Sequence, residues 1–337
     1  MPILTEAEEI SDIAFGYMAS KALFAALHFG IFTHLSQAPA RVEDLAAKIG
    51  VPAERCRTLL TALAALGLIE RDGGAYRNSP AAERFLVKGA KYDFSDYLRL
   101  QVHQQMYPLM DQIEPALAGE LPEEATASYA EWFSDPEEAR LYSESQHAGS
   151  LGPALGLARR VDLSGARKLL DVGGGTGAFA ITLCEAFPEL SATIVDFPNV
   201  ATLGRTFIDK AGLSDRIAYR EGNALETDWP EAQDAILMSY LLSGVPDHTH
   251  VGLIERALRH LAPGGLLMVH DFIVDSDRAG PKNTALWQLQ HTAFTPEARS
   301  LADDWLETQL KAAGFENVSV EPLIPGMTKL AVGTRPA

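Results

Sequence analysis

The stretch that decides the fold is KLLDVGGGTGAFA, residues 168–180. Its apolar start is typical of a short buried strand, and the residues from Ala178 to Phe187 continue as a helix. Glycines fit the turn between them because they tolerate positive φ and let a ligand approach the backbone. The following helix presents free N–H groups to an anionic group. The segment predicts a nucleotide-type binding loop with four candidate cofactor-binding residues: Asp171, Gly173, Gly175 and Gly177.

The rest of the C-terminal half, residues 164–337, repeats the alternation of strand and helix. The apolar runs KLLDV, ATIVD, AYREG, AILMS and LLMVHDF are separated by helical stretches, a pattern that predicts βαβ units and a parallel sheet. The last segment, FENVSVEPLIPGMTKLAVGT, contains two strand-like runs around a Pro-Gly turn with no crossover helix between them. We therefore expect an α/β fold: a doubly wound Rossmann-like sheet that ends in an antiparallel hairpin.

An acidic residue follows the glycine loop at an informative distance. The second strand ends in Asp196, about 20 residues after Gly177, an interval at which a carboxylate can reach a ribose hydroxyl pair. The third strand ends in Gly222-Asn223-Ala224, where Asn223 could hydrogen-bond an adenine edge. The nicotinamide fingerprint is not cleanly present and a Walker lysine is absent, which disfavours a dinucleotide or a triphosphate. A merely structural turn is the alternative, and the spacing to Asp196 disfavours it.

The N-terminal region, residues 1–91, has little strand signal. Apolar residues recur near helical spacing and predict one long amphipathic helix: Ile13, Tyr17, Phe24, Leu27 and Ile31. Two further helices are expected at 42–49 and 53–66, followed by a hairpin around Asp72-Gly73-Gly74. This is the layout of a winged helix. DNA binding is the alternative interpretation, but Arg55 and Arg57 against Glu54 leave too small a basic excess. We expect instead a module that buries apolar surface against a second subunit.

The composition of the chain limits the kinds of partner that we expect it to bind. The formal net charge of -17 argues against nucleic acid and against an anionic membrane surface. The two cysteines, Cys56 and Cys184, lie in apolar helical patterns and support neither a disulfide framework nor a zinc site. The N-terminus lacks a signal-peptide pattern, and no apolar run is expected to span a bilayer. A cytoplasmic location is the simplest expectation.

Several segments together resemble a known family. DVGGGTGAFA followed by VDFPNV is similar to the small-molecule O-methyltransferases, which include plant phenolic enzymes and bacterial enzymes of pigment and antibiotic pathways. ALFAALHFGIFTHL, DLAAKIG and LLTALAALGLIE resemble their N-terminal dimerisation domain, and LKAAGF resembles their C-terminal helix. The resemblance covers nearly the whole chain. It implies S-adenosylmethionine as cofactor, a homodimer through residues 1–91, a helical cover over residues 92–163, and a small-molecule acceptor.

The resemblance also implies roles for individual residues. Gly173 would face the methionine part of the cofactor, Asp196 would bind the ribose, and Phe197 would lie near the adenine. Asn223, followed by Ala224, stands where the family generally has an acidic adenine contact. The remaining implied cofactor residues are Ser239 near the carboxylate, and Tyr142 and Gln146 closing over the site.

The sequence departs from the family at the catalytic base. The O-methylating members usually show a Leu-His-Asp-Trp-like run, whereas here Leu242 is followed by Ser243, Gly244 and Val245. Serine is a poor general base at neutral pH. The other candidates for the chemistry are His270 and Asp271 at the end of the fifth strand, and His291 on the following helix. The candidate substrate residues are His103, Tyr107, Tyr240, Trp287 and Gln288.

A missing base leaves several functions open. A thioether sulfur, an amine or an already acidic group can attack a sulfonium methyl directly, so that proximity and orientation supply most of the catalysis. S-methylation of a small thioether acid, as suggested for relatives in dimethylsulfoniopropionate synthesis, is therefore one alternative, and N- or C-methylation is another. A non-catalytic cofactor-binding regulator is a third. No compact ligand spacing supports a metal.

Overall fold

The computed structural model describes residues 3–121, 133–295 and 297–337. Backbone contacts divide the chain into two units, Met1–Gln105 and Met106–Ala337. This division falls inside the segment 92–163 that the sequence sets apart as a helical cover. The three-part boundaries 1–91, 92–163 and 164–337 stay a prediction.

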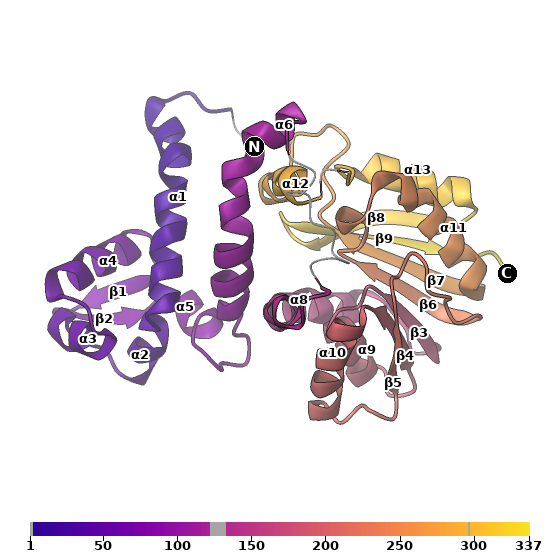
Figure 1. Cartoon of the computed structure of the whole chain (residues 1–337), viewed down its shortest axis with the longest axis horizontal. Helices are drawn as coiled ribbons and strands as arrows, with labels where there is room; N and C mark the ends of the chain where they lie inside the picture. The colour runs from indigo at the N-terminus through magenta and orange to yellow at the C-terminus, as the bar shows by residue number, and fades with distance from the viewer. Residues whose placement is uncertain (1–2, 122–132, 296) are drawn as a thin grey trace. The chain divides into compact units, whose positions relative to one another are not determined.

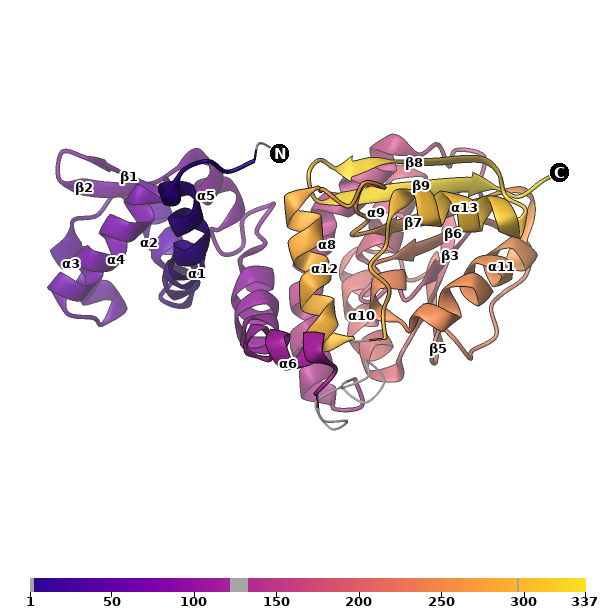
Figure 2. The same ribbon diagram turned by 90° about the horizontal axis from the view of Figure 1, so that it is seen from above.

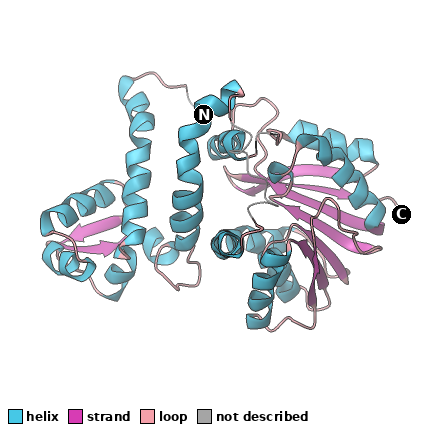
Figure 3. Ribbon diagram, in the orientation of Figure 1, coloured by secondary structure: helices cyan, strands magenta, loops and turns pink. Residues whose placement is uncertain are grey.

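The first unit is mainly helical around one small hairpin (Figure 3). Its elements are α1 (Ala7–His28), α2 (Ile31–Gln37), α3 (Val42–Ile49), α4 (Ala53–Ala65), β1 (Ile69–Asp72), β2 (Ala75–Asn78), α5 (Pro80–Phe85) and the π-helix η1 (Tyr97–Met106). The hairpin at Gly73 and Gly74 is confirmed, since β1 pairs antiparallel with β2 and both glycines have positive φ. Arg57 forms ion pairs with Glu43 and Glu54, which neutralise part of the small positive charge of α4.

The expectation of one long first helix is wrong at its C-terminal end. The backbone takes a left-handed conformation at Gly30, with φ of 64°, and the chain restarts as α2 at Ile31. A glycine allows this break because it carries no Cβ. Ile31 is therefore part of a different helix from Ile13 and Tyr17, and is fully buried.

The first two-thirds of α1 expose apolar side chains in the single chain. Ile13 is 69% exposed and Tyr17 is 54% exposed, whereas the buried residues Phe24, Ala26 and Leu27 lie near its C-terminal end. The helix is also long and apolar enough to cross a membrane by length and composition. The expectation that no run reaches that length is therefore wrong, and the apolar face of α1 needs another explanation.

The second unit is an α/β domain. Its helical elements are η2 (Tyr107–Gln112), α6 (Ile113–Ala118), α8 (Pro136–Arg160), α9 (Ala178–Ala186), α10 (Pro198–Lys210), η4 (Leu242–Gly244), η5 (Asp247–Thr249), α11 (His250–His260), α12 (Lys282–Phe294) and α13 (Asp303–Ala313). Its strands are β3 (Lys168–Val172), β4 (Ser191–Asp196), β5 (Ile217–Glu221), β6 (Gln233–Ser239), β7 (Leu261–Asp271), β8 (Glu316–Ile324) and β9 (Thr328–Thr334).

The sheet has the order β5-β4-β3-β6-β7-β9-β8. The first five strands are parallel, and β9 and β8 are antiparallel; Figure 2 shows the last two running in opposite directions. This confirms the doubly wound sheet and its closing hairpin. The strand order reverses at β3, with β4 on one side and β6 on the other, and ligands bind at the carboxyl ends of strands at such a point.

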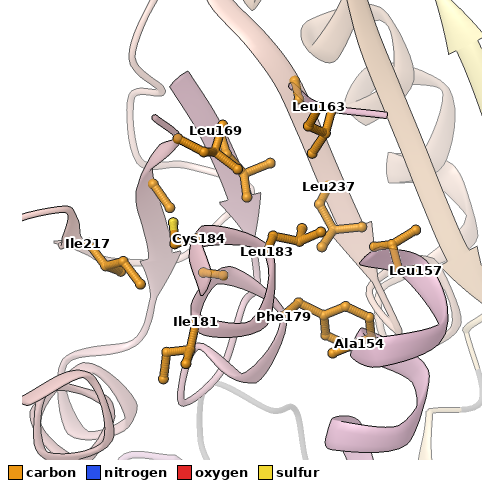
Figure 4. Close-up of a cluster of buried hydrophobic side chains, with 14 of the residues drawn as sticks. Ala154, Leu157, Leu163, Leu169, Phe179, Ile181, Leu183, Cys184, Ile217 and Leu237 are labelled. Carbon is orange, nitrogen blue, oxygen red and sulfur yellow. The ribbon is translucent and has the colours of Figure 1, made fainter. Parts of the chain in front are cut away.

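Helices cover both faces of the sheet, with α8, α9 and α10 on one face and α11 and α13 on the other (Figure 1). Neighbouring strand residues point to opposite faces. Leu169 accordingly packs with Leu157 of α8 and Leu183 of α9 (Figure 4), while Leu170 belongs to the cluster that contains Leu306 of α13. Burial on both faces explains why the parallel strands are continuously apolar in sequence. It also fixes the loops at their carboxyl ends.

Both cysteines are free and buried. Cys184 lies in the cluster beneath α9, and Cys56 lies in the core of the first unit. The prediction that they act as small core residues is confirmed.

Candidate functional site

A cavity of about 600 Å³ opens at the carboxyl ends of the parallel strands. Its walls come from the loops after β3, β4, β5 and β6, from the N-terminal half of α8, from the turn after η4 and from the loop after α12. This is the crevice expected at the reversal of strand order. A volume in this range is typical of a small-molecule site.

The glycine loop has the conformation that its composition predicts. Gly173, Gly175 and Gly177 all have positive φ, and the first two line the cavity. Gly177 lies behind it, where an added Cβ would come within 2.9 Å of the Ile194 side chain. At Gly174 an added Cβ would come within 2.5 Å of the Asp171 carboxyl carbon. Each glycine therefore meets a conformational or steric need.

Asp171 lies beneath this loop, outside the cavity lining. Its side chain is fully buried, and neither carboxyl oxygen accepts a hydrogen bond of normal geometry from the residues that the structure describes. Burial raises its pKa to about 7, helped by the neighbouring charge of Asp196, although the Ala180 backbone N–H opposes the shift. A buried carboxyl group without a donor is costly.

Asp196 connects the end of β4 to the glycine loop. Its Oδ2 accepts a hydrogen bond from the Gly175 N–H at 2.7 Å, and its Oδ1 accepts one from the Phe197 N–H at 2.8 Å. Burial raises its pKa to about 6, and these two N–H groups oppose the shift. A carboxylate has about four acceptor positions, so lone pairs remain for a ligand in the cavity.

One end of the cavity is aromatic. The rings of Phe133 and Tyr142 lie 5.1 Å apart and those of Phe133 and Phe197 lie 5.9 Å apart. Asn223 lines the same cavity, and its Oδ1 accepts from the Leu225 N–H at 3.0 Å, which leaves its amide NH₂ group to donate. The Oε1 atom of Gln146 is buried without a hydrogen-bond donor among the described residues. This end offers a flat apolar surface with polar groups at its border.

The cavity floor follows β6. Ser239 and Tyr240 line it, and Tyr240 takes a positive φ of 56° although it is not glycine. Such a backbone conformation persists only where the surroundings enforce it. The Tyr240 N–H donates to the His270 carbonyl at 2.8 Å, and its ring packs against those of His270 and Phe272. Ala224, another predicted residue, also lines the cavity.

His270 is held on both ring nitrogens. Nδ1 lies 2.9 Å from the Ser239 Oγ, and Nε2 lies 2.9 Å from the Thr328 Oγ1. The residue is fully buried, and burial lowers its pKa to about 3. Its position is behind the cavity floor, where it joins β6, β7 and β9.

The η4 turn is fixed from two sides at Ser243. The Ser243 N–H donates to the Oδ2 of buried Asp271 at 3.0 Å, and the Ser243 carbonyl lies 2.5 Å from the His291 Nδ1. A carbonyl oxygen only accepts, so Nδ1 carries the proton and Nε2 the lone pair. Burial lowers the pKa of His291 to about 4 and raises that of Asp271 to about 6, and in both cases Ser243 opposes the shift. Ser243 itself is 5% exposed and lies outside the cavity lining.

The remaining predicted substrate residues also lie outside the lining. Gln288 donates to the carbonyls of Phe272 and Leu301, and the Trp287 ring stacks on Phe272 with centroids 4.5 Å apart. Tyr107 begins η2, in the second unit. His103 is in the first unit, where its ring stacks on Phe24 and its Nε2 lies 3.1 Å from the Lys21 Nζ.

Two features of the site went unpredicted. Thr295, Glu297 and Ala298 line the cavity from the loop after α12, a segment with no strand-end or glycine signal. His147 on α8 lies 2.7 Å from the Thr176 hydroxyl of the glycine loop. Its helical pattern could have placed it on α8, but not opposite the loop. Among the described ranges, no group of three or more metal-ligating side chains is close enough to hold an ion.

Known proteins are similar to this chain in sequence and in the fold described above. Residues 125–316 match the model of an O-methyltransferase domain, and residues 11–88 match that of an O-methyltransferase dimerisation domain. The chain is 31% identical to a 3-hydroxy-5-methyl-1-naphthoate 3-O-methyltransferase of Streptomyces sahachiroi, over 97% of this chain and 94% of that protein. It is 32% identical to the N,N-dimethyltransferase OxyT of Streptomyces rimosus, over 93% of this chain and 91% of that protein. Its fold matches human N-acetylserotonin methyltransferase in complex with SAM at a TM-score of 0.85 and 23% identity, over the whole of both chains.

Proposed function

Because this chain belongs to the O-methyltransferase family, we propose that the cavity binds S-adenosylmethionine and that the protein methylates a small acceptor without an imidazole base. The protein is an S-adenosylmethionine-dependent methyltransferase. When bound, that cofactor supplies a methyl group activated by a sulfonium sulfur. One observation carries the proposal: the glycine loop and Asp196 border one cavity, and no histidine is among its described lining residues.

The residues of the cavity fit this cofactor. Gln146 lines the cavity, and its buried Oε1 has no hydrogen-bond donor among the described residues, so it is an acceptor that suits a ligand there. We assign the ribose to Asp196 and the adenine to the aromatic end with Phe197 and Asn223. Glycine at 173 and 175 leaves the loop backbone open to close approach. Ser239 and Tyr142 complete the set that borders the ligand.

The residues first considered for the chemistry suit a positioning role. Asp271 and His291 hold the N–H and the carbonyl of Ser243, and His270 supports Ser239 from behind. Together they fix the η4 turn beside the cavity. We therefore propose that orientation of the acceptor, rather than a base at Ser243, supplies most of the catalysis.

Family membership leaves the acceptor atom open. One similar protein is named a 3-O-methyltransferase and another an N,N-dimethyltransferase, at nearly equal identity to this chain. An amine, an already acidic hydroxyl or a thioether sulfur suits a site without an imidazole base.

We further propose a cytoplasmic homodimer. Residues 11–88 match a dimerisation domain, and the exposed apolar face of α1 at Ile13 and Tyr17 lies in that span. Burial of this face against a second copy would explain its composition.

Transfer of a labelled methyl group tests the proposal. The protein is incubated with methyl-labelled S-adenosylmethionine and a panel of phenols, amines and thioethers, and products are identified by mass spectrometry. We expect label in at least one acceptor. A protein that binds the cofactor but labels no member of the panel would be a cofactor-binding regulator instead.

A further inference from the structure

The described lining of the cavity carries negative charge alone. Its ionisable side chains are the carboxylates of Asp196 and Glu297 and the phenols of Tyr142 and Tyr240, and it includes no described lysine, arginine or histidine. Asp196 accepts the two loop N–H groups described above, whereas Glu297 comes from the loop after α12. The whole chain has a formal net charge of -17. Such a field attracts cations and repels anions.

Glu297 is left without a counter-ion by an ion pair next to it. Arg299, two residues along, forms a bidentate pair with Asp247 at 2.7 and 2.9 Å. Its guanidinium also lies 4.8 Å from the centre of the Trp305 ring. No cationic group within the described parts of the chain lies within 4.0 Å of the Glu297 carboxylate. The nearest arginine in sequence is therefore committed elsewhere.

The backbone of Glu297 is held in place. Its carbonyl accepts a hydrogen bond from the Asp247 N–H at 2.8 Å, so the loop after α12 is joined to the turn that includes Val245 and Pro246. Both segments line the cavity. The backbone that carries this exposed carboxylate is therefore tied to the cavity wall.

Glu297 lies with the part of the cavity wall that follows β6. Cavity walls follow the sheet order, from Asn223 after β5 and Asp196 after β4, past the glycine loop after β3, to Tyr240 after β6. The residues assigned to adenine and ribose lie at the β5 and β4 end. Glu297 lines the cavity with the turn that follows β6, and the Oγ1 of nearby Thr295 lies 3.4 Å from the Ser243 carbonyl oxygen in the η4 turn.

We propose that the methyl acceptor is an amine, bound in its ammonium form by Glu297. This inference rests on the proposed function and narrows it to nitrogen. The Glu297 carboxylate takes a proton from the ammonium group, which frees the nitrogen lone pair. That pair forms the new nitrogen–carbon bond to the methyl group as the carbon–sulfur bond breaks, and the electron pair of the broken bond stays on sulfur. The methylated nitrogen carries the positive charge, and the Glu297 proton returns to water.

Binding of three probes of matched shape tests the charge preference. Tyramine, tyrosol and 4-hydroxyphenylacetate share a phenol ring and end in an ammonium, a hydroxyl and a carboxylate. Calorimetry on the full chain measures each affinity for the wild type, for Glu297→Gln and for the control Glu226→Gln, an exposed residue outside the lining. We expect tyramine to bind the wild type and Glu226→Gln at least about tenfold more tightly than tyrosol, and Glu297→Gln to lose that preference.

Product analysis supplies a second measurement. With labelled S-adenosylmethionine and tyramine, mass spectrometry should find the methyl group on nitrogen. The proposal is overturned if tyramine has no advantage over tyrosol, if the advantage survives in Glu297→Gln, or if the methyl group appears only on the phenol oxygen. Failure to bind S-adenosylmethionine would instead overturn the proposed function, so the two failures are distinguishable.

Discussion

At the scale of single residues, burial rather than residue type decides what each candidate can do. Asp171, His270 and Asp271 have chemistry-bearing side chains, yet each is fully enclosed behind the cavity. Sequence position placed them at strand ends, which is correct, but successive residues of a strand point to opposite faces. Whether a side chain at a strand end lines the crevice depends on packing. Packing also decides that Glu297 lines the cavity, and no sequence pattern marks this residue as part of a site.

The buried Asp171 predicts an unusual pH dependence of stability. Its pKa is raised from 3.8 to about 7 in the folded chain, so between these values the folded state binds more protons than the unfolded state. Its contribution to stability is present below about pH 4 and is lost as the pH rises to 7. We expect Asp171→Asn to unfold in urea at higher free energy than the wild type at pH 7.5, by about 1 to 3 kcal/mol. The difference should shrink at pH 4.5; an equal difference at both pH values would contradict this.

Ser243 predicts a small effect of losing its hydroxyl. The Ser243 N–H and carbonyl form hydrogen bonds with Asp271 and His291, which an alanine keeps, so that only the hydroxyl hydrogen bond to Asp271 is lost. We expect Ser243→Ala to lower kcat by less than about threefold, whereas loss of a general base costs about 10²- to 10⁴-fold. His291→Ala removes the bond to the Ser243 carbonyl and should cost more, about tenfold. A hundredfold loss in Ser243→Ala would make the serine a catalytic residue.

At the scale of elements, the agreement between sequence and structure is closest where backbone chemistry is most demanding. The glycine loop, the hairpin at Gly73 and the turn at Gly326 could all be predicted, because positive φ at these points calls for glycine. The break at Gly30 obeys the same rule but lies inside a continuous apolar stripe. The turn there could not be predicted, because the apolar residues of α1 and Ile31 of α2 continue one helical spacing across it.

The glycine loop predicts a position-specific cost of adding one methyl group. Gly177→Ala places a Cβ against Ile194 at a φ of 82°, so it should destabilise the protein by about 1 to 3 kcal/mol and weaken cofactor binding. The matched control is Gly152→Ala on α8, where an added Cβ meets nothing within 4 Å. That variant should be neutral or more stable by up to about 1 kcal/mol. Equal urea midpoints for the two variants would rule out this account of Gly177.

At the scale of the whole molecule, hydrophobic pattern defines the fold and leaves the assembly to be tested. The continuous apolar strands and the alternation with helices sufficed to predict the sheet and its closing hairpin. The apolar residues of α1 were equally visible in the sequence, but their exposure in one chain could not be read from spacing. Their burial requires a surface that the chain itself does not provide.

The exposed face of α1 predicts a dimer that a charge can break. We expect the wild type to sediment as a dimer at micromolar concentration and Ile13→Glu to sediment as a folded monomer, because a buried unpaired carboxylate opposes association. Val251→Glu is the control, since Val251 is an exposed apolar residue of the second unit, on α11. A wild type that stays monomeric, or an Ile13→Glu variant that stays dimeric, would contradict an interface on α1.

The central claim is that the cavity at the glycine loop holds S-adenosylmethionine, and titration calorimetry tests it most directly. The wild type should bind one S-adenosylmethionine per chain. Asp196→Asn should bind it at least about tenfold more weakly, because a charged acceptor to the ribose is lost, while the exposed control Asp228→Asn should match the wild type. A wild type that releases no heat of binding, or an affinity that is unchanged in Asp196→Asn, would contradict the account.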